Sequence, residues 1–348
     1  MIFDKMLDKP SIWLDATGPY PEIVLSSRVR YARNLIQYPF VQRAKVSDLK
    51  AILDVVQKSA SDSELLKGST FIEMRSISQL DKKFLLERHL VSYEMVGDNK
   101  DRGLIISEDE KSIIMINEED HIRLQTFASG LDLFTVYTFL DKIDDELGRN
   151  LDYAFSNEWG YLTACPTNVG TGLRASVLLH LPGLVLTKEI EKVLRGVTQI
   201  GLSVRGLYGE GTEVKGNFFQ VSNQTTMGKK EEDIIKGLDK VVRGLIEYER
   251  NARNTLLNDA SPQVEDKIFR AYGLLKNARI LSSDEVINLT SAVRLGVGLG
   301  MIKNISMKTL NEVLIISQPA HLQKIFGKKM DTEERDVIRA NYIRERII

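Results

Sequence analysis

Cysteine is almost absent from this sequence, and its scarcity limits the chemistry that the chain can carry. The 348 residues include one cysteine, Cys165, and four histidines. One cysteine excludes an intramolecular disulfide framework and is typical of a reducing compartment. One cysteine and four scattered histidines also exclude a structural zinc cluster. The length leaves ample room for a buried core, so no such cross-links are needed.

An excess of charge of one sign and a long apolar run are also missing. Lys and Arg number 47 against 48 Asp and Glu, which gives a net charge of -1. No overall basic field therefore indicates nucleic acid or anionic lipid, and any anion site must be local. No apolar run reaches membrane-spanning length, and the first residues lack the apolar segment of a secretory signal. We expect a soluble cytoplasmic protein that binds neither nucleic acid nor membrane directly.

The common glycine motifs for phosphate binding are missing as well. No Walker A pattern, GxxxxGK[ST], occurs in the chain. The glycines of "GEG" and "GVGLG" do not form a dinucleotide fingerprint, because neither lies between a clear strand and a helix in the required order. A nucleotide site in this chain would have to use other residues.

The pattern of apolar residues predicts an α+β fold. Strand-like alternation is concentrated before about residue 225, among a few long helices, and the pattern from Glu231 onward is almost wholly helical. This favours a largely antiparallel or mixed sheet with helices packed on it. The segment 186–200 predicts one helix with Thr187 near its cap. Asn258–Gln263 breaks the periodicity and predicts a linker between domains 1–255 and 256–348.

Three arginines lie close together in the stretch "LSSRVRYARNL". On a strand, Arg28 and Arg30 share a face, roughly 6.6 Å apart. Arg33 falls on the other face, and we expect it to be structural. Two guanidinium groups this close repel each other unless an anion lies between them, and their shape matches phosphate oxygens. The alternative is a solvated basic edge.

A second charged stretch, "INEEDHIRL", contains three consecutive carboxylates. If the strand pattern holds, Glu119, His121 and Arg123 point the same way. That arrangement would place a carboxylate and an anion-binding guanidinium on one surface. A solvated turn is the alternative, because adjacent carboxylates are usually exposed to water.

Two glycine-rich segments carry further candidates. In "ACPTNVGTGLRASV", glycines allow the backbone to approach a ligand closely, and Arg174 leads into an apolar strand where an unpaired arginine would be costly. Cys165 is either an inert small residue or a partly exposed thiolate. The loop "VRGLYGEGTE" adds Arg205 and Glu210.

Taken together, these segments describe one site. An arginine cage can hold a triphosphate and neutralise transition-state charge without a P-loop lysine. The carboxylates Glu119 and Glu210 are then left to hold a cationic group. The five arginines of the expected cage are Arg28, Arg30, Arg123, Arg174 and Arg205.

The segments "SSRVRYARN", "NEEDHIR", "CPTNVGTGLRASV" and "RGLYGEG" resemble the signature segments of the phosphagen (guanidino) kinases, in order and approximate spacing. The resemblance covers about residues 22–250, the expected core of a catalytic domain, and implies ATP:guanidino phosphotransfer. Magnesium would travel with ATP, bound mainly by phosphates and water. The resemblance implies nucleotide contacts from Ser27, Arg28, Val29, Arg30, Tyr31, His89, Arg123, Arg174, Ala175, Ser176, Val177, Leu178, Arg205, Gly206, Leu207, Tyr208 and Gly209.

The resemblance also implies catalytic roles. Glu119 and Glu210 would hold the substrate guanidinium, with Glu119 the preferred candidate for the base, and Cys165 would be the reactive cysteine beside the substrate. A guanidinium has a pKa above about 12, so it is a poor nucleophile until a nitrogen loses its proton. A carboxylate can accept that proton while alignment with the γ-phosphate does most of the rest.

Some features differ from kinases of small metabolites. The first arginine motif begins at Ser26, so we expect their helical N-terminal domain to be missing, and Leu178 stands where they usually have histidine. The C-terminal "RDVIRA" resembles the RDxxRA motif of the bacterial protein-arginine kinases. On a helix two arginines four residues apart are neighbours, so the motif could bind phosphoarginine, with Asp336 on the guanidinium. Spacing alone favours the alternative of a solvated helical face, because the segment is rich in charge throughout, and the resemblance reverses this preference. The motif residues are Arg335, Asp336, Arg339 and Ala340.

This resemblance implies a protein-arginine kinase of the cytoplasmic stress response, regulated through RDxxRA. Its expected partners are proteins with an accessible arginine, an activator protein, a heat-shock repressor, a Clp unfoldase and further copies of the chain. One alternative is a kinase for free arginine or another small guanidino compound. The other is a phosphoarginine-binding adaptor without catalysis, against which the retained acids argue.

Overall fold

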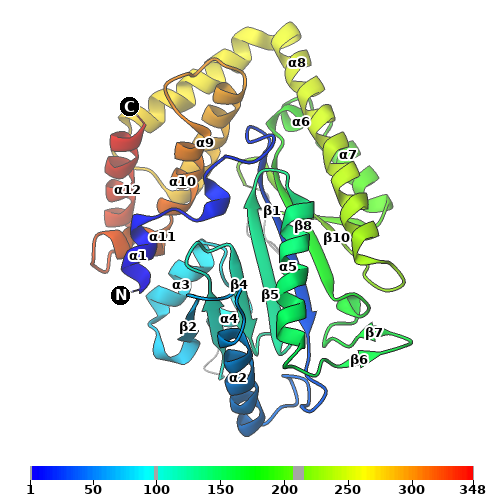
Figure 1. Cartoon of the computed structure of the whole chain (residues 1–348). Coiled ribbons are helices and arrows are strands. Elements are labelled where there is room, and N and C mark those ends of the chain that lie inside the picture. The colour runs from blue at the N-terminus through cyan, green and yellow to red at the C-terminus, as the bar shows by residue number, and fades with distance from the viewer. Residues whose placement is uncertain (1, 98–100, 207–214, 348) are drawn as a thin grey trace.

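The strand-rich half of the chain is built on one antiparallel sheet (Figure 1). The structure is a computed structural model that describes residues 2–97, 101–206 and 215–347. The sheet has eight strands in the order β2-β3-β4-β5-β1-β8-β10-β9, which confirms the α+β prediction. The strands are β1 Val24–Arg33, β2 Thr70–Glu73, β3 Gly103–Ile106, β4 Ser112–Ile116, β5 Ile122–Ser129, β8 Leu173–His180, β9 Leu202–Arg205 and β10 Phe218–Asn223.

Helices surround this sheet and form most of the C-terminal part. A separate two-stranded hairpin joins β6 Phe155–Ser156 to β7 Gly160–Tyr161. The α-helices are α1 Ile2–Asp8, α2 Val46–Ser61, α3 Gln79–Glu87, α4 Tyr93–Gly97, α5 Leu133–Gly148, α6 Pro182–Leu186, α7 Ile190–Gln199, α8 Glu231–Asn277, α9 Ser283–Gly298, α10 Met307–Ile316, α11 Pro319–Ile325 and α12 Thr332–Arg346. Short 3-10 turns are η1 Ile12–Leu14, η2 Met74–Ser76 and η3 Pro166–Asn168.

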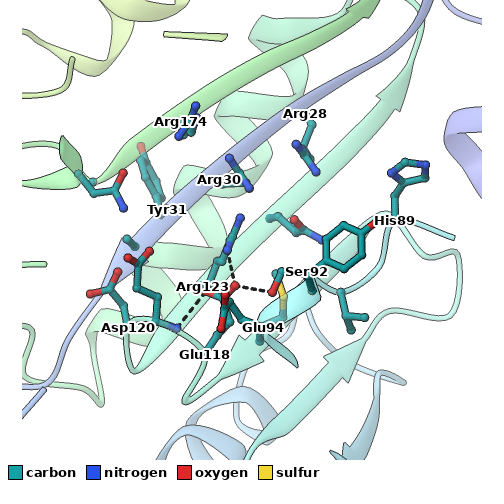
Figure 2. A pocket seen from close by; sticks show the side chains of 18 of the residues that line it. Arg28, Arg30, Tyr31, His89, Ser92, Glu94, Glu118, Asp120, Arg123 and Arg174 are labelled. Atoms are coloured by element: carbon teal, nitrogen blue, oxygen red, sulfur yellow. Dashed lines mark hydrogen bonds and ion pairs between the residues drawn. The ribbon is translucent and has the colours of Figure 1, made fainter. Parts of the chain in front are cut away.

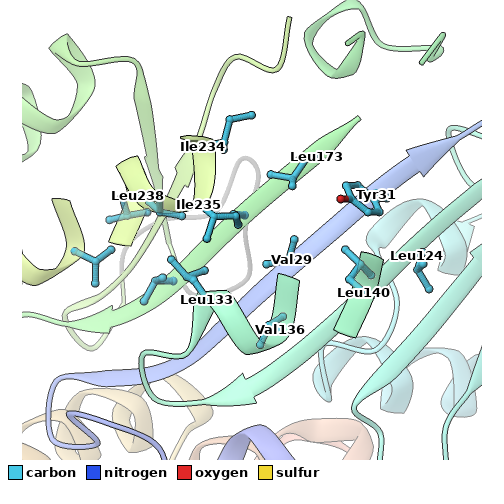
Figure 3. Close-up of a cluster of buried hydrophobic side chains, with 14 of the residues drawn as sticks. Val29, Tyr31, Leu124, Leu133, Val136, Leu140, Leu173, Ile234, Ile235 and Leu238 are labelled. Atoms are coloured by element: carbon cyan, nitrogen blue, oxygen red, sulfur yellow. The ribbon is translucent and has the colours of Figure 1, made fainter. Parts of the chain in front are cut away.

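One face of the sheet is covered by α5 and the first part of α8 (Figure 3). Alternation along β1 sends Val29 into this face, where it packs with Leu133, Val136 and Ile235. The same alternation sends the residues on either side of Val29 to the opposite face. The apolar layer therefore fixes the strand register and decides which side chains are left for a site.

Arg33 lies on the covered face, as parity predicts. Its side chain is buried, forms an ion pair with Asp144 of α5 at 2.7 Å, and lies over the Tyr161 ring at 3.5 Å from the centroid. Gly172 lies against this strand with φ +64, and a Cβ there would come within 2.6 Å of the Ala32 carbonyl oxygen. Arg33 is therefore structural, and Gly172 allows the next strand to approach it.

The predicted linker at Asn258–Gln263 coincides with a break between the two helical halves of α8, although the chain there is a kink and not an extended linker. The helix is kinked there: Ala260 has φ -144 and ψ 30, and Pro262 follows. The second half of α8 packs with α9, α10 and α12 in a core of its own. The helix predicted over 186–200 is present as α7, but it begins at Ile190, and Thr187 instead caps the end of α6.

The C-terminal helices dock against α3. Glu87, at the end of α3, accepts hydrogen bonds from the backbone N–H groups of Ala320 and His321 at 2.8 and 2.9 Å. Lys324 of α11 forms an ion pair with Asp81 at 2.5 Å. This contact anchors the element that leads directly into His89. Across the ranges that the structure describes, no helix has both the length and the apolar character required to span a bilayer.

Candidate active site

The face of the sheet opposite α5 carries a cavity of about 680 Å³. The β1–β8 register pairs Arg30 with Arg174, and Arg123 lies on β5, on the other side of β1 (Figure 2). The structure thus brings together all five arginines that the sequence predicted for one cage. The arginines that line the cavity are Arg28, Arg30, Arg123, Arg174 and Arg205.

The guanidinium groups of this cage repel one another. Burial, followed by the charges of Arg123, Arg174 and Arg205, lowers the pKa of Arg28 to about 9. Burial and the charge of Arg123 also hold the pKa of Arg30 well below its ordinary value. The Arg30 Nε atom is buried and has no hydrogen-bond partner among the described residues. An anion between the arginines would relieve the repulsion and satisfy these donors.

Glu118 is a site residue that the sequence reasoning did not select. Its carboxylate is 3% exposed, pairs with Arg123 at 2.5 Å, and accepts a hydrogen bond from the Ser92 hydroxyl. Burial acts to raise its pKa, but Arg123 and the hydrogen bonds outweigh burial and lower the pKa to about 2. Glu118 therefore orients Arg123 and stays ionised, which makes it unsuitable as a base.

We expect Glu118→Gln to flatten the acid dependence of stability. A carboxyl group with a folded pKa of about 2 and an ordinary value of 4.5 contributes stability above pH 4.5 that is lost as the pH falls toward 2. Urea unfolding at pH 7 and pH 3 should show a smaller loss for the variant than for the wild type. Equal losses would contradict the assigned ion pair.

Glu119, the predicted base, lines the cavity together with Arg123. Its backbone N–H donates to Glu118 at 3.0 Å, and its backbone carbonyl accepts from Gln42 at 2.9 Å. Both backbone groups of Glu119 are thereby fixed. The side chain is half-buried at the edge of the arginine cage, where it can meet a cationic substrate.

His121 does not point the same way as Glu119 and Arg123, so that part of the prediction is wrong. The His121 ring is buried, accepts from the Leu35 N–H at 3.0 Å and lies 2.9 Å from the Pro39 carbonyl oxygen. The physical reason is that β5 begins at Ile122, so strand alternation does not extend back through this turn.

Asp120 connects the turn that precedes β5 to the loop that contains Cys165. It accepts hydrogen bonds from Asn34 at 2.6 Å and from the Ala164 N–H at 2.7 Å. Cys165 follows, half-exposed, with Sγ 3.0 Å from the Thr167 hydroxyl. Cys165 itself does not line the cavity, although Asn168 of the same loop does. The structure therefore places the cysteine at the border of the site.

Three of the remaining predicted nucleotide contacts line one of the two cavities. His89 lines the cavity, with burial and the Arg28 charge lowering its pKa to about 3, so the ring is neutral. Ser176 and Leu178 line a small adjoining cavity. Gly206 directly follows β9. The predicted residues Leu207, Tyr208, Gly209 and Glu210 lie outside the described residues.

For five of the predicted nucleotide contacts, the side chain has another place in the fold. The Ser27 hydroxyl donates to the Gly130 carbonyl at 2.8 Å, which occupies it in a buried turn. Strand alternation places the side chains of Val29, Ala175 and Val177 in the apolar core on the other face. Tyr31 borders the cavity, but its hydroxyl donates to Asp141 at 3.1 Å on the covered side. A contact from these residues to a nucleotide would have to come from their backbone groups, and it stays a prediction.

The RDxxRA residues lie on α12, and the structure gives Arg339 a structural role. Its buried guanidinium donates to the Ser317 and Leu281 carbonyls, both at 2.7 Å, and pairs with Asp336. Arg335 donates to the Met330 carbonyl at 3.0 Å. Ala340 is packed in the C-terminal core. The two arginines therefore make separate contacts, in contrast to the shared phosphate site that the resemblance implied.

We expect Arg339→Met to destabilise the protein by about 3 kcal/mol, because two buried carbonyls and Asp336 lose their donor. Arg335→Ala should change the free energy of unfolding by less than about 1 kcal/mol, since its contacts are more exposed. Chemical denaturation of both variants checks this difference. Equal destabilisation would contradict the separate roles.

Comparison with known proteins agrees with this geometry. Residues 51–252 match the ATP:guanido phosphotransferase C-terminal catalytic domain, and residues 261–348 match the protein-arginine kinase McsB C-terminal domain. The protein-arginine kinase of Symbiobacterium thermophilum is 46% identical over 340 residues, which cover 97% of this chain and 96% of that protein. The protein-arginine kinase of Geobacillus sp. (strain WCH70) is 44% identical over 350 residues, covering 100% and 97%.

Solved structures show the same catalytic fold. The duplicated taurocyamine kinase from Schistosoma mansoni, with bound transition state analog components, has a TM-score of 0.62 and 26% identity, covering 70% of this chain and 35% of that one. Lombricine kinase has a TM-score of 0.60 and 25% identity, covering 70% and 71%. Together with the arginine-lined cavity, these matches show that the chain belongs to the protein-arginine kinases of the ATP:guanido phosphotransferase family.

Proposed function

We propose that this kinase transfers the γ-phosphate of ATP to arginine side chains of proteins through the cavity described above. The observation that carries the proposal is the placement of five repelling guanidinium groups beside Glu119 in a single cavity. Arginines on neighbouring strands hold the phosphates and neutralise charge in the transition state. Glu119 holds the substrate guanidinium and accepts its proton. Glu210 is proposed as the second carboxylate and Cys165 as a neighbour of the substrate.

Magnesium is proposed to enter with the nucleotide. Within residues 2–97, 101–206 and 215–347, no group of three or more His, Cys, Asp or Glu side chains could hold a metal ion. The donors lining the phosphate end of the cavity are arginines, which repel a cation. The ion would therefore be bound mainly by phosphates and water, and it would offset charge on the triphosphate.

We also propose the cellular setting that the family resemblance implies. The kinase would act in the cytoplasm, as a homo-oligomer, with an activator protein, a heat-shock repressor and a Clp unfoldase as partners. Phosphoarginine would bind at RDxxRA and regulate activity. Because Arg339 already holds two backbone carbonyls, Arg335 is the residue better placed for the phosphate, and Asp336 for the guanidinium.

The test compares two acceptors, an unfolded protein and free arginine, with labelled ATP as donor. We expect label on the protein, stable at neutral pH and lost in acid, and little turnover of free arginine. The alternative, a kinase for a small guanidino compound, is favoured by the likeness to taurocyamine and lombricine kinases. Fast turnover of free arginine with no label on protein would establish that alternative.

A further inference from the structure

A second, smaller cavity of about 20 Å³ adjoins the arginine-lined cavity. The two cavities share Arg28, His89 and Gln220, so they are neighbouring parts of one cleft. Its walls are more apolar than those of the arginine cage, with Phe127 and Leu178 among them. The cleft therefore changes from a charged end to an aromatic and apolar end.

The N-terminal segment contributes one wall of this smaller cavity through Trp13 of η1. The Trp13 ring is 2% exposed and meets the His89 ring edge-to-face, with centroids 5.4 Å apart. Its indole Nε1–H is buried and has no acceptor among the residues that the structure describes. A buried N–H without an acceptor is costly, and in native proteins such a group usually has a partner from protein, water or ligand.

The strand register places the smaller cavity, which Trp13 also lines, beyond the arginines expected to bind the phosphates. Arg28 is opposite Ser176 on β8, and Ser26 is opposite Leu178. Moving from the first pair to the second is a step of roughly 6.6 Å away from the phosphate-binding arginines. A nucleotide whose phosphates contact the arginines would extend its ribose and base along this step. The base itself would lie in the larger cavity beside His89, which lines both cavities, and the edge of the base that faces the smaller cavity would offer an acceptor to the indole N–H.

We propose that Trp13 is a specificity-determining residue for the nucleotide, and that its Nε1–H donates a hydrogen bond to a ring nitrogen of adenine. This inference rests on the proposed use of ATP by the same site. It assigns a nucleotide-binding role to the N-terminal segment, which lies outside all the signature segments of the sequence. The hydrogen bond would satisfy the buried donor only when nucleotide is bound, so it contributes directly to binding.

The test measures equilibrium binding of MgATP and of its 1-deaza, 3-deaza and 7-deaza analogues. Trp13→Phe keeps an aromatic ring and removes the N–H. We expect the variant to bind ATP about tenfold more weakly, as one buried hydrogen bond predicts. We expect kcat at saturating ATP and the KM for protein substrate to stay unchanged. One deaza analogue should bind the wild type about tenfold more weakly than ATP, yet bind the variant as well as ATP does.

Trp159→Phe is the matched control, because Trp159 is 48% exposed and is the other of the two tryptophans in the chain. It should bind ATP like the wild type. Equal ATP affinity in Trp13→Phe and wild type, with both variants folded in thermal unfolding, would overturn the inference. If Trp13→Phe does not fold, the analogues are compared on the wild type alone. The inference is overturned if all three deaza analogues bind the wild type as tightly as ATP does. A wild type that binds no ATP would instead refute the proposed function.

Discussion

Replacing Glu119 with glutamine should lower kcat for arginine phosphorylation about 10³-fold and leave the fold intact. The amide keeps the shape of the side chain but cannot accept the guanidinium proton, and general-base catalysis contributes about 10²–10⁴-fold. The fold should survive because Glu119 is held by its backbone, through Glu118 and Gln42, and its side chain is half-buried at the cavity edge. The KM for ATP should change little, since the arginines bind the phosphates.

Steady-state kinetics of purified Glu119→Gln, with thermal unfolding as the folding check, measures this effect. Glu158→Gln is the control, because Glu158 is exposed on the β6–β7 turn and away from the cavity. The control should retain wild-type turnover. If Glu119→Gln retained more than half of wild-type kcat, Glu119 would not be the base.

Replacing Arg28 with glutamine should have opposite effects on activity and stability. Loss of one phosphate ligand should lower kcat/KM for ATP about 10²-fold or more, because Arg28 is one of the five cage arginines. The nucleotide-free protein should become more stable, by about 1 kcal/mol at pH 7, because a repelled and desolvated charge is removed. A site built to bind an anion is destabilised when the anion is absent.

The lowered pKa of Arg28 also predicts how its effect on the free energy of unfolding changes with pH. A folded pKa of about 9 lies below the ordinary value of 12.5, so between these values the unfolded chain binds more protons than the folded chain. The destabilisation of the folded state by charged Arg28 is thus fully present below about pH 9 and disappears as the pH rises toward 12.5. Guanidinium chloride unfolding at pH 7 and pH 10 should show the stability advantage of Arg28→Gln becoming smaller at the higher pH.

Arg33→Gln is the matched control on the same strand. Arg33 is buried in an ion pair with Asp144, so its removal should destabilise the protein by about 3–5 kcal/mol. Arg28→Gln and Arg33→Gln should therefore shift stability in opposite directions. An Arg28→Gln protein that is less stable than wild type, without nucleotide, would contradict the repulsion assigned to the cage.

Strand parity allowed most of the arginine geometry to be predicted from sequence. Arg28 and Arg30 face the cavity and Arg33 faces α5 because side chains alternate regularly from Arg28 to Arg33. The prediction for His121 failed because parity holds only inside a strand, and Asn117, with φ +59, begins a turn before β5. Local alternation cannot reveal where a strand starts.

Contacts between segments far apart in the chain could not be predicted from the sequence. Glu118 differs from Glu119 by its pairing with Arg123 and Ser92, and nothing in "NEED" shows which acid will be buried. Trp13 carries no motif, and its role appears only when η1 packs beside His89. The interruption of periodicity at Asn258–Gln263 did locate the break in α8 at Ala260, but the sequence did not show that the helix resumes at once, because proline is tolerated in the first turn of a helix.

The most direct test of this account is a crystal structure with MgADP, nitrate and an arginine-containing peptide, a mimic of the phosphoryl-transfer transition state. The account predicts phosphate and nitrate oxygens within hydrogen-bonding distance of Arg28, Arg30 and the other cage arginines, with the peptide guanidinium on Glu119. A nucleotide bound elsewhere, or a guanidinium that does not contact Glu119, would contradict it.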